Sequence, residues 1–419
     1  MEFVIEQAKI ISPGDAFDTK TISIKIKDGF VHTISSKKIS CEKVIKSQNL
    51  HLSPGWIDIG SQCGEPGFEH RETLATLAKS AALGGYTTVA VFPNTLPVIQ
   101  SKSEIEYIKQ KTKSLPANII PVGALSKQCE GKEIAELIDM YQNGAIAFSD
   151  GKSPVQDTGV ILRAMLYSRH FNGLIINQPE DSAIAALGQI HEGMISQRLG
   201  LKGISEIAET IMLRRDLDLA KYTEVNLLSH LLSTQEGVSL LRQHKKVNKK
   251  IFSSVGYLNL VFTDEALEDF DSVYKQSPPL RDKKHQKALI KGVKDGTIDI
   301  ICSNHRALEI EKKDLEFGYA TPGAIGLQTS FAAVNTFTEI SIFDWVKSVS
   351  TNPSRILNIK NTSIKVGNPA NFTFFDPTTE WTFDESRIVS LTKNSPFIGK
   401  KFKGKVIGTA FNQHLTLNN

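Results

Sequence analysis

Side chains that could bind a metal ion or move a proton follow several short apolar runs of this sequence. Five of them belong to residue types that ligate zinc: Cys63, His70, Asp150, His230 and His305. A catalytic zinc needs about three donors from thiolate, imidazole or carboxylate groups. A site built from this set is one hypothesis. Cys63 and His230 are more simply explained as core residues, because free cysteine is usually buried and a lone histidine on an apolar strand is usually hydrogen-bonded.

Three serines, Ser61, Ser149 and Ser303, also lie at predicted strand ends. A serine hydrolase needs a serine, a histidine and an acid held together. No such set is visible in the sequence, and serines at strand ends usually bond to backbone groups or cap helices. We therefore interpret these three serines as structural.

Eight short apolar runs, separated by helical stretches, must position these side chains. Several runs are almost continuously apolar, as strands buried on both faces should be. Segments between them, such as 71–85 and 131–143, repeat apolar residues at three and four and stop at Gly or Asn-Gly. Eight strands with crossover helices predict an α/β fold, a (β/α)8 TIM barrel. The runs are GWIDIG, YTTVAVFPN, NIIPVGAL, GAIAFSD, GLIINQP, VNLLSH, KKIFSSV and IDIICSN.

A doubly wound open sheet is the alternative fold, but no GxGxxG follows an early strand.

Both ends of the chain differ from the middle, with alternating apolar and polar residues in TISIKIK, ANFTFFDP and GKVIGTAFN. We therefore predict a small β domain, a β-sandwich, assembled from residues 1–52 and 361–419, around a barrel at 53–360. In a barrel, functional residues gather where the strands end.

The order of the motifs along the chain resembles dihydroorotases of the multifunctional-complex type and, more broadly, the amidohydrolase superfamily with its allantoinases and hydantoinases. Any one of these motifs is a weak signal, whereas their order and spacing together are specific. The motifs are PGWID, EPG, GGYTTVAVFPNTLPV, GAIAFSDGKSPV, PPLR, DGTIDIICSNH, TPGAIGLQTS, NPSRILNI, ANFTFFDP and NSPFIGKKFKGKVIGT.

The resemblance implies one or two zinc ions held by histidines and carboxylates on the barrel strands. In such enzymes the metal supplies a hydroxide that attacks a cyclic amide, and an aspartate on the last strand moves protons. This sequence departs from that pattern at most ligand positions. An arginine that usually grips the substrate is Gly64, and His230 stands one residue before a ligand position, so alternation points it to the opposite face. The emptied positions are Gly60, Gln62, Gln178, Leu231 and Asn304.

The chemistry of these replacements predicts that the metal site and the hydrolytic activity are lost. Gly60 and Leu231 offer no donor, and the amides of Gln62, Gln178 and Asn304 match neither the charge nor the softness of the groups they replace. Asn304 also cannot accept a proton near neutral pH. We expect no cofactor and a structural or regulatory partnership with aspartate carbamoyltransferase, as in similar silent chains. The alternative is an active dihydroorotase or related cyclic amidohydrolase with an altered zinc site.

Only part of the family's substrate pocket is kept. Asn94 matches a substrate-contacting asparagine, although it also suits a turn before Pro97, and Ser277 replaces another asparagine. Asp150 is the remaining acid of a Ser-Asp-Asp-Gly pattern and a possible bridging ligand. With His305, these residues are the candidate ligand contacts: Asn94, Asp150 and His305.

Composition indicates a cytoplasmic globular protein. Of the 419 residues, 40% are hydrophobic and 22% are charged, and no apolar run approaches the roughly 18 residues that span a bilayer. MEFVIEQAKI does not match a secretory signal. A net charge of +4 is too small to indicate nucleic acid binding. The four cysteines lack metal or disulfide spacing and are expected to be reduced and mostly buried. We expect a homo-oligomer.

Overall fold

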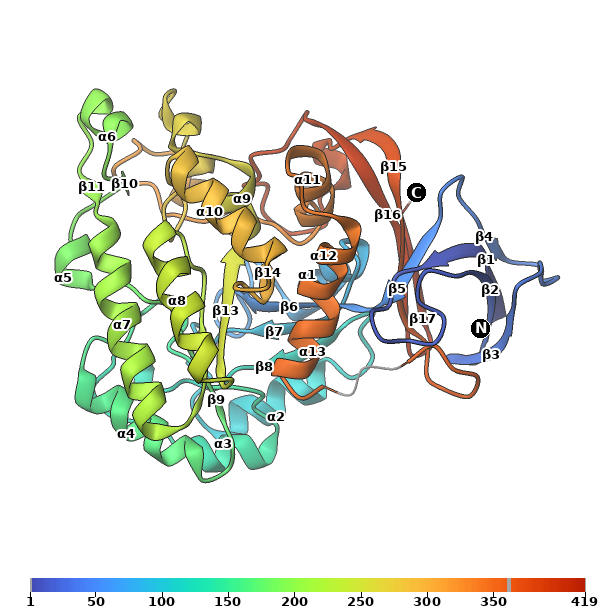
Figure 1. Ribbon diagram of the computed structural model, residues 1–419, viewed down its shortest axis with the longest axis horizontal. Helices are drawn as coiled ribbons and strands as arrows, with labels where there is room; N and C mark the ends of the chain where they lie inside the picture. Colours follow the sequence, from blue (N-terminus) through green and yellow to red (C-terminus); the bar gives the residue numbers. More distant parts are fainter. Residues whose placement is uncertain (1, 360–362, 419) are drawn as a thin grey trace.

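The computed structural model describes residues 2–359 and 363–418 and contains a barrel flanked by a β domain (Figure 1). The predicted barrel boundary between residues 360 and 361 lies outside the described residues. No helix of the described ranges is long and apolar enough to cross a membrane.

Seven named strands and three isolated bridges form the barrel in the described residues, and all neighbours run parallel. Phe148 takes the fourth strand position, because it bridges Gly123 on one side and Ile175 on the other. A bridge between Gln62 and Arg306 brings the last strand back to the first and closes the circle. The strands are β6 (Trp56–Ser61), β7 (Tyr86–Val91), β8 (Asn118–Pro121), β9 (Leu174–Asn177), β12 (Asn226–Ser229), β13 (Ile251–Gly256) and β14 (Ile300–Cys302).

Helices follow the strands, and short polar side chains begin most of the long ones. Asp157, Thr234 and Asp282 each accept hydrogen bonds from backbone N–H groups of the first turn, which would otherwise have no partner. The outer helices are α1 (Leu74–Leu83), α2 (Lys102–Lys111), α3 (Leu137–Asn143), α4 (Thr158–Arg169), α7 (Glu206–Thr223), α8 (Gln235–Val247), α10 (Lys283–Lys294) and α11 (Ser330–Phe337). Shorter elements are α5 (Ser182–Ala185), β10 (Ile190–His191), α6 (Met194–Leu199), β11 (Gly203–Ile204), α9 (Tyr257–Val261), α12 (Ile342–Val346) and α13 (Asn352–Ile356).

The predicted helix over 131–143 is wrong for residues 131–136. Ile134 pairs with Ser126 in a β-bridge, and the backbone N–H of Lys127 donates to the carbonyl of Glu133 at 2.8 Å. This local pairing holds the segment extended, so α3 begins only at Leu137. Apolar periodicity alone did not reveal the competing contact.

Both ends of the chain build the β domain, as predicted. The sheet runs in the order β17-β16-β15-β5-β1-β2-β3, with β4 beside β1, and the antiparallel pair β5–β15 joins the two ends. Buried residues of both ends, including Phe3, Ile24 and Phe374, share one core. The strands are β1 (Glu2–Ile10), β2 (Thr21–Lys27), β3 (Phe30–Ser35), β4 (Val44–Ile45), β5 (His51–Pro54), β15 (Asn371–Thr382), β16 (Lys401–Phe411) and β17 (His414–Leu417).

Gly55 alone separates β5 of the β domain from β6 of the barrel. Its N–H donates to the carbonyl of Asn371 at 3.0 Å, and a Cβ atom there would collide with the side chains of Thr87 and Asn371. Only glycine fits so close an approach of backbone to side chains. The first barrel strand is therefore tied directly to the neighbouring domain.

Candidate active site in the barrel mouth

The ends of β6, β9, β12 and β14 bring the positions of the expected metal ligands to one mouth of the barrel. Two of the replacements are linked through Ser277: the side-chain amide of Gln178 donates to its hydroxyl at 3.2 Å, and that of Asn304 donates to its carbonyl at 3.2 Å. Gln178 Oε1 is buried and accepts no hydrogen bond from the described residues. A cavity of about 360 Å³ opens beside Ser277 and is also lined by Glu180, Gln189, Ile204, Lys275, Gln276, Pro279 and residues 318–322.

His230 corrects the prediction from strand alternation. Its imidazole faces the mouth, since a Cβ atom on Gly60 would come within 2.6 Å of His230 Nε2. The chain leaves β12 at Ser229, but the backbone N–H of His230 still donates to the carbonyl of Asn177 at 2.9 Å, which extends the pairing with β9. By alternation His230 therefore points to the same face as Leu228, a residue of the barrel interior. His230 Nδ1 pairs with the hydroxyl of Ser254 at 2.9 Å, whereas Nε2 is buried without a partner among the described residues. One imidazole thus fills the space above Gly60.

Lys152 reaches into the mouth, and the sequence analysis missed it. Its ammonium donates to Asn304 Oδ1 at 2.6 Å. Burial, together with the nearby charge of Arg306, lowers the pKa of Lys152 to about 7. The only sequence signal was a lysine placed directly after the turn Ser149-Asp150-Gly151. A cation therefore lies beside the position where the resemblance implies a metal.

A carboxylate closes the seam between the first and last strands. Asp58 accepts hydrogen bonds from the backbone N–H of Ser303 at 2.7 Å, from the Ser303 hydroxyl at 2.8 Å and from the Ser61 hydroxyl at 2.6 Å. Burial raises the pKa of Asp58, while these donors oppose the shift. Ser61 and Ser303 thus hold the frame together, and Ser149 accepts from the N–H of Gly151. Ser303 also accepts from the backbone N–H of His305 at 3.2 Å, and none of the three serines bonds to an imidazole of the described residues.

The three candidate ligand contacts do not converge on one pocket. Asn94 braces the fourth strand end, because its amide donates to the carbonyl of Asp150 at 3.0 Å and accepts from the N–H of Lys152 at 3.2 Å. Asp150 accepts from the N–H of Ser126 at 2.8 Å and from its hydroxyl, and burial raises the pKa of Asp150 to about 6. These hydrogen bonds indicate that Asn94 and Asp150 stabilise the loop after the fourth barrel strand.

His305 points away from the mouth toward the start of α1. Its Nε2 lies 3.2 Å from Glu72 Oε2, and its Nδ1 accepts from the N–H of Gly326 at 3.2 Å. Both the histidine and the glutamate are fully buried. His305 therefore joins the last strand to the helix layer.

The hypothetical set of metal ligands is not assembled. Cys63 is buried beside the backbone of Glu65 and Glu72, and burial raises the pKa of its thiol, which keeps it protonated. His70 is exposed next to Phe68. All four cysteines are free and three are buried, as the sequence predicted.

Three of the emptied positions keep an unusual backbone. Gly60, Leu231 and Asn304 have φ values of +89, +56 and +46. Residues other than glycine rarely adopt this conformation, and when they do they often lie at functional sites. Glycine adopts positive φ freely and asparagine does so more often than most residues, so Leu231 is the unusual one of the three.

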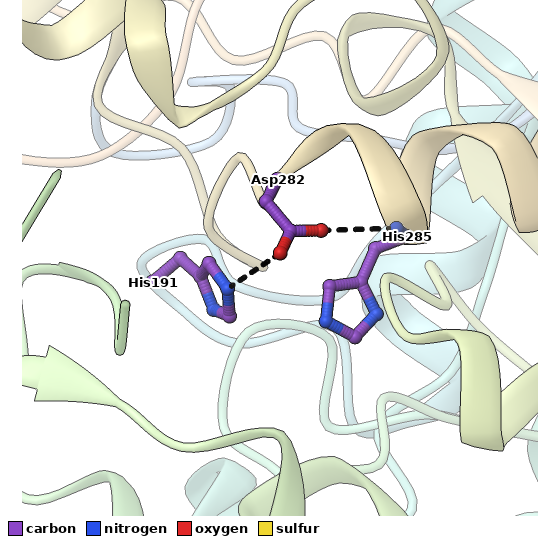
Figure 2. Close-up of side chains that lie close together, drawn as sticks. All are labelled: His191, Asp282 and His285. Atoms are coloured by element: carbon purple, nitrogen blue, oxygen red, sulfur yellow. Dashed lines mark hydrogen bonds and ion pairs between the residues drawn. The ribbon is translucent and has the colours of Figure 1, made fainter. Parts of the chain in front are cut away.

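Outside the mouth, His191, Asp282 and His285 form a compact group near the start of α10 (Figure 2). One potential ligand atom from each lies within 4.8 Å of the others, the one such group among the described residues. Asp282 Oδ2 is 3.9 Å from His191 Nε2, and Glu206 Oε2 is 3.5 Å from His285 Nε2. The distances would allow a small cation between them.

Hydrogen bonding on the far side of both rings argues against a metal in this group. The guanidinium of Arg281 donates to His191 Nδ1 at 3.1 Å, and the backbone N–H of Gln235 donates to His285 Nδ1 at 2.9 Å. A neutral imidazole that accepts at Nδ1 carries its hydrogen on Nε2, whereas a metal ligand donates through the nitrogen that does not bind the metal. Burial and the charge of Arg281 lower the pKa of His191 to about 4, which keeps this ring neutral.

The whole architecture matches solved hydrolase barrels. An L-hydantoinase (dihydropyrimidinase) from Arthrobacter aurescens superposes with a TM-score of 0.86 at 21% identity, covering 99% of this chain and 95% of that one. A dihydropyrimidinase from Brevibacillus agri NCHU1002 gives 0.84 at 20% identity, covering 100% and 95%. The fold class is therefore that of the amidohydrolase TIM barrels with a terminal β-sandwich, which confirms the prediction.

Comparison with known sequences identifies the family of this chain within that fold class. Residues 50–236 match the model of the dihydro-orotase-like family, and residues 179–412 match the amidohydrolase family. A dihydroorotase from Thermoanaerobacter sp. (strain X514) is 37% identical over 97% of this chain and 95% of its own length. One from Acetivibrio thermocellus is 35% identical over 97% and 98%. The chain belongs to the dihydroorotase-like family of the amidohydrolases.

The mouth residues of this family member do not fit the zinc that the resemblance implies. Gly60 and Leu231 bring no donor atom, and the imidazole of His230 occupies the space next to Gly60. Asn304 Oδ1 is engaged by the amine of Lys152, and the charged form of this lysine disfavours a second cation in the same buried space. A catalytic zinc needs about three donors, and among the described residues the mouth offers His230 and, in the lining of its cavity, the carboxylate of Glu180.

Proposed function

We propose that this chain is a dihydroorotase-family protein that holds no zinc, does not hydrolyse dihydroorotate, and acts as a structural or regulatory partner of aspartate carbamoyltransferase. The observation that carries the first part is the pairing of Lys152 with Asn304 in the barrel mouth at 2.6 Å. At the position where the resemblance implies a metal ligand, Asn304 is instead hydrogen-bonded to a lysine.

Hydrolysis of a cyclic amide needs an activated water and a group that moves the proton. Asn304 replaces the aspartate expected to move protons, and an amide is not basic near neutral pH. The nearest carboxylate on the first strand, Asp58, is occupied by three donors from Ser61 and Ser303. The described mouth therefore supports a scaffold better than a hydrolase.

An exposed apolar surface on α7 and the segment after α5 supports the partner role. Ile207 and Ile211 lie four residues apart on one face of α7 and are about half exposed, and Leu187 beside α5 is 82% exposed. This side of the barrel lies away from the β domain (Figure 1). Large exposed apolar side chains on a helix face are typical of protein interaction sites.

The first experiment measures zinc and turnover together. Purified chain should contain less than about 0.1 zinc per molecule and show no dihydroorotate hydrolysis above background. The Thermoanaerobacter dihydroorotase serves as the active control in the same assay. Stoichiometric zinc, or turnover that a chelator abolishes, would disprove the proposal.

The second candidate function is an active dihydroorotase with an altered site. It is favoured by curated dihydroorotases 34–37% identical to this chain over nearly its full length. In that case Lys152, whose pKa is about 7, is the basic group in the mouth. Any turnover that a chelator leaves intact should then fall at least about 100-fold in Lys152→Met, the loss expected for a general base. Turnover unchanged in that variant would exclude this route.

The partner role is tested by mixing purified chain with the aspartate carbamoyltransferase of the same organism. A complex should elute as one species on size-exclusion chromatography with light scattering. Ile211→Glu should dissociate it, and Tyr167→Glu, on an exposed part of α4, is the matched control. Separate elution of the two wild-type proteins would disprove the partner role and leave the zinc result untouched.

A further inference from the structure

A second cavity lies at the junction of the barrel and the β domain. It has a volume of about 310 Å³, within the range of small-molecule sites. Helices α1 and α11 form one wall, and the strands β15 to β17 with the loop after β15 form the other (Figure 1). The lining residues are Lys79, Leu83, Gln328, Phe331, Ala332, Trp381, Phe383, Arg387, Val389, Lys405, Val406, Leu417 and Asn418.

Three cationic side chains line this cavity, Lys79, Arg387 and Lys405, and no lining residue is acidic. Burial and the nearby charge of Arg387 lower the pKa of Lys405. Within residues 2–359 and 363–418, Lys79 forms no ion pair, whereas Arg387 Nε lies 3.3 Å from Asp384 Oδ2. Like charges held close together destabilise each other, and a bound anion relieves that repulsion.

Aromatic rings supply the apolar part of the same walls. Trp381 and Phe383 pack edge to face with 6.0 Å between ring centroids, and the guanidinium of Arg387 lies 5.6 Å from the Trp381 ring. Phe331 closes the other side. Phe331 and Phe383 are almost fully buried, so the partly exposed Trp381 is the ring on which a flat ligand would stack, whereas a bare inorganic anion gains nothing from it.

The amide side chains in the cavity hold the walls rather than a ligand. Gln328 donates to the carbonyl of Arg387 at 2.8 Å and accepts from the N–H of Val389 at 3.1 Å. Asn418 donates to the carbonyls of Leu83 at 2.7 Å and Val406 at 2.9 Å. These bonds fix helices to strands, so the cavity is preformed.

We infer that this junction cavity binds a small anion joined to a flat heteroaromatic ring, with the chemistry of a pyrimidine nucleoside monophosphate. The cations would hold the phosphate, and the aromatic wall would hold the ring. The modest volume favours a single six-membered ring. None of the lining residues belongs to the barrel mouth, so the inference is independent of zinc and of hydrolysis.

The test is titration calorimetry of the intact chain with uridine 5′-monophosphate, uridine and inorganic phosphate. The monophosphate should bind at least about tenfold more tightly than either part, since charge and stacking both contribute. Quenching of tryptophan fluorescence should accompany binding, because Trp381 lines the cavity.

Two variants and one matched control make the test specific. Lys405→Gln and, separately, the exposed Lys79→Gln should each weaken binding about tenfold, the effect of one charged hydrogen bond. Lys287→Gln removes the same charge from the groove of lysines between α8 and α10, which has no aromatic lining, and should change affinity less than about twofold. No binding, equal weakening by Lys287→Gln, or phosphate binding as tightly as the monophosphate would each overturn the inference.

Discussion

The seam of the barrel and its mouth are only a few residues apart, yet their polar groups are in opposite states. At the seam, Asp58 receives three hydrogen bonds from Ser61 and Ser303. At the mouth, Gln178 Oε1 and His230 Nε2 are buried without partners among the described residues. Buried polar groups are normally paired, so these two atoms are exceptions, as are others elsewhere in the described residues, such as Ser168 Oγ and Trp345 Nε1.

This contrast separates what holds the barrel together from what its mouth could do. The seam needs every one of its bonds because it joins the first strand to the last. The mouth contributes little to closure, so its side chains can change without unfolding the chain. Four predictions test this division, in order of decreasing effect.

Asp58→Ala should lower the free energy of unfolding by about 3–5 kcal/mol, because it leaves buried donors of Ser61 and Ser303 without an acceptor. Urea unfolding followed by circular dichroism measures the change. Ser61→Ala is the control, with an expected loss of about 1 kcal/mol. If Asp58→Ala lowered the free energy of unfolding by less than about 1 kcal/mol, the hydrogen bonds at the seam would contribute no more to stability than the mouth residues do.

His191→Gln should make the protein less sensitive to acid. The pKa of His191 is about 4 in the folded state against 6.5 for the free side chain, so the unfolded state binds a proton first. Stability therefore falls as pH drops from about 6.5 to 4. Between pH 7 and 4.5, wild type should lose about 2 kcal/mol more than the variant. Parallel pH profiles from urea unfolding would contradict this reading.

Lys152→Met should stabilise the protein by about 1 kcal/mol at pH 7, since burying the amine disfavours its charged form. The folded pKa of about 7 lies below the free value of 10.5, so wild-type stability rises with pH between these values. The advantage of the variant should therefore shrink toward pH 10 in thermal unfolding. An advantage that grows with pH would show that the ammonium is stabilised in the mouth.

Zinc should leave the melting temperature unchanged within about 1 °C at 10 μM. A site with a Kd of 0.1 μM would instead stabilise the fold by about 2.7 kcal/mol under these conditions. Differential scanning calorimetry with and without a chelator gives the comparison. A rise in melting temperature that His191→Gln removes would assign a metal to the group of His191, Asp282 and His285.

The fold was predictable because strand and helix periods are properties of short segments. GWIDIG and IDIICSN carry the buried strands β6 and β14 within a residue or two. The segment 131–136 failed because its backbone pairs with Ser126 and Lys127, a contact that apolar periodicity does not encode. The β domain was found because both termini share the alternating pattern.

The emptied positions were assigned from flanking motifs that fix their register, and this assignment stays a prediction. The direction of His230 was predicted wrongly, because the pairing of β12 with β9 extends to His230 and places it on the same face as Leu228. The contact of Lys152 with Asn304 joins residues 152 positions apart, and a loop lysine gives no sign of its burial. Tertiary structure decides both.

Gly55 gives the molecule a mechanical property. With a single residue between β5 and β6, and with its backbone bonded to Asn371, tension applied to the β domain passes straight into the first barrel strand. No flexible linker between β5 and β6 can extend before the force reaches the barrel. Because both chain ends lie in the β domain, force applied at them loads its sheet first, and once β5 separates from β15 the load passes directly to β6.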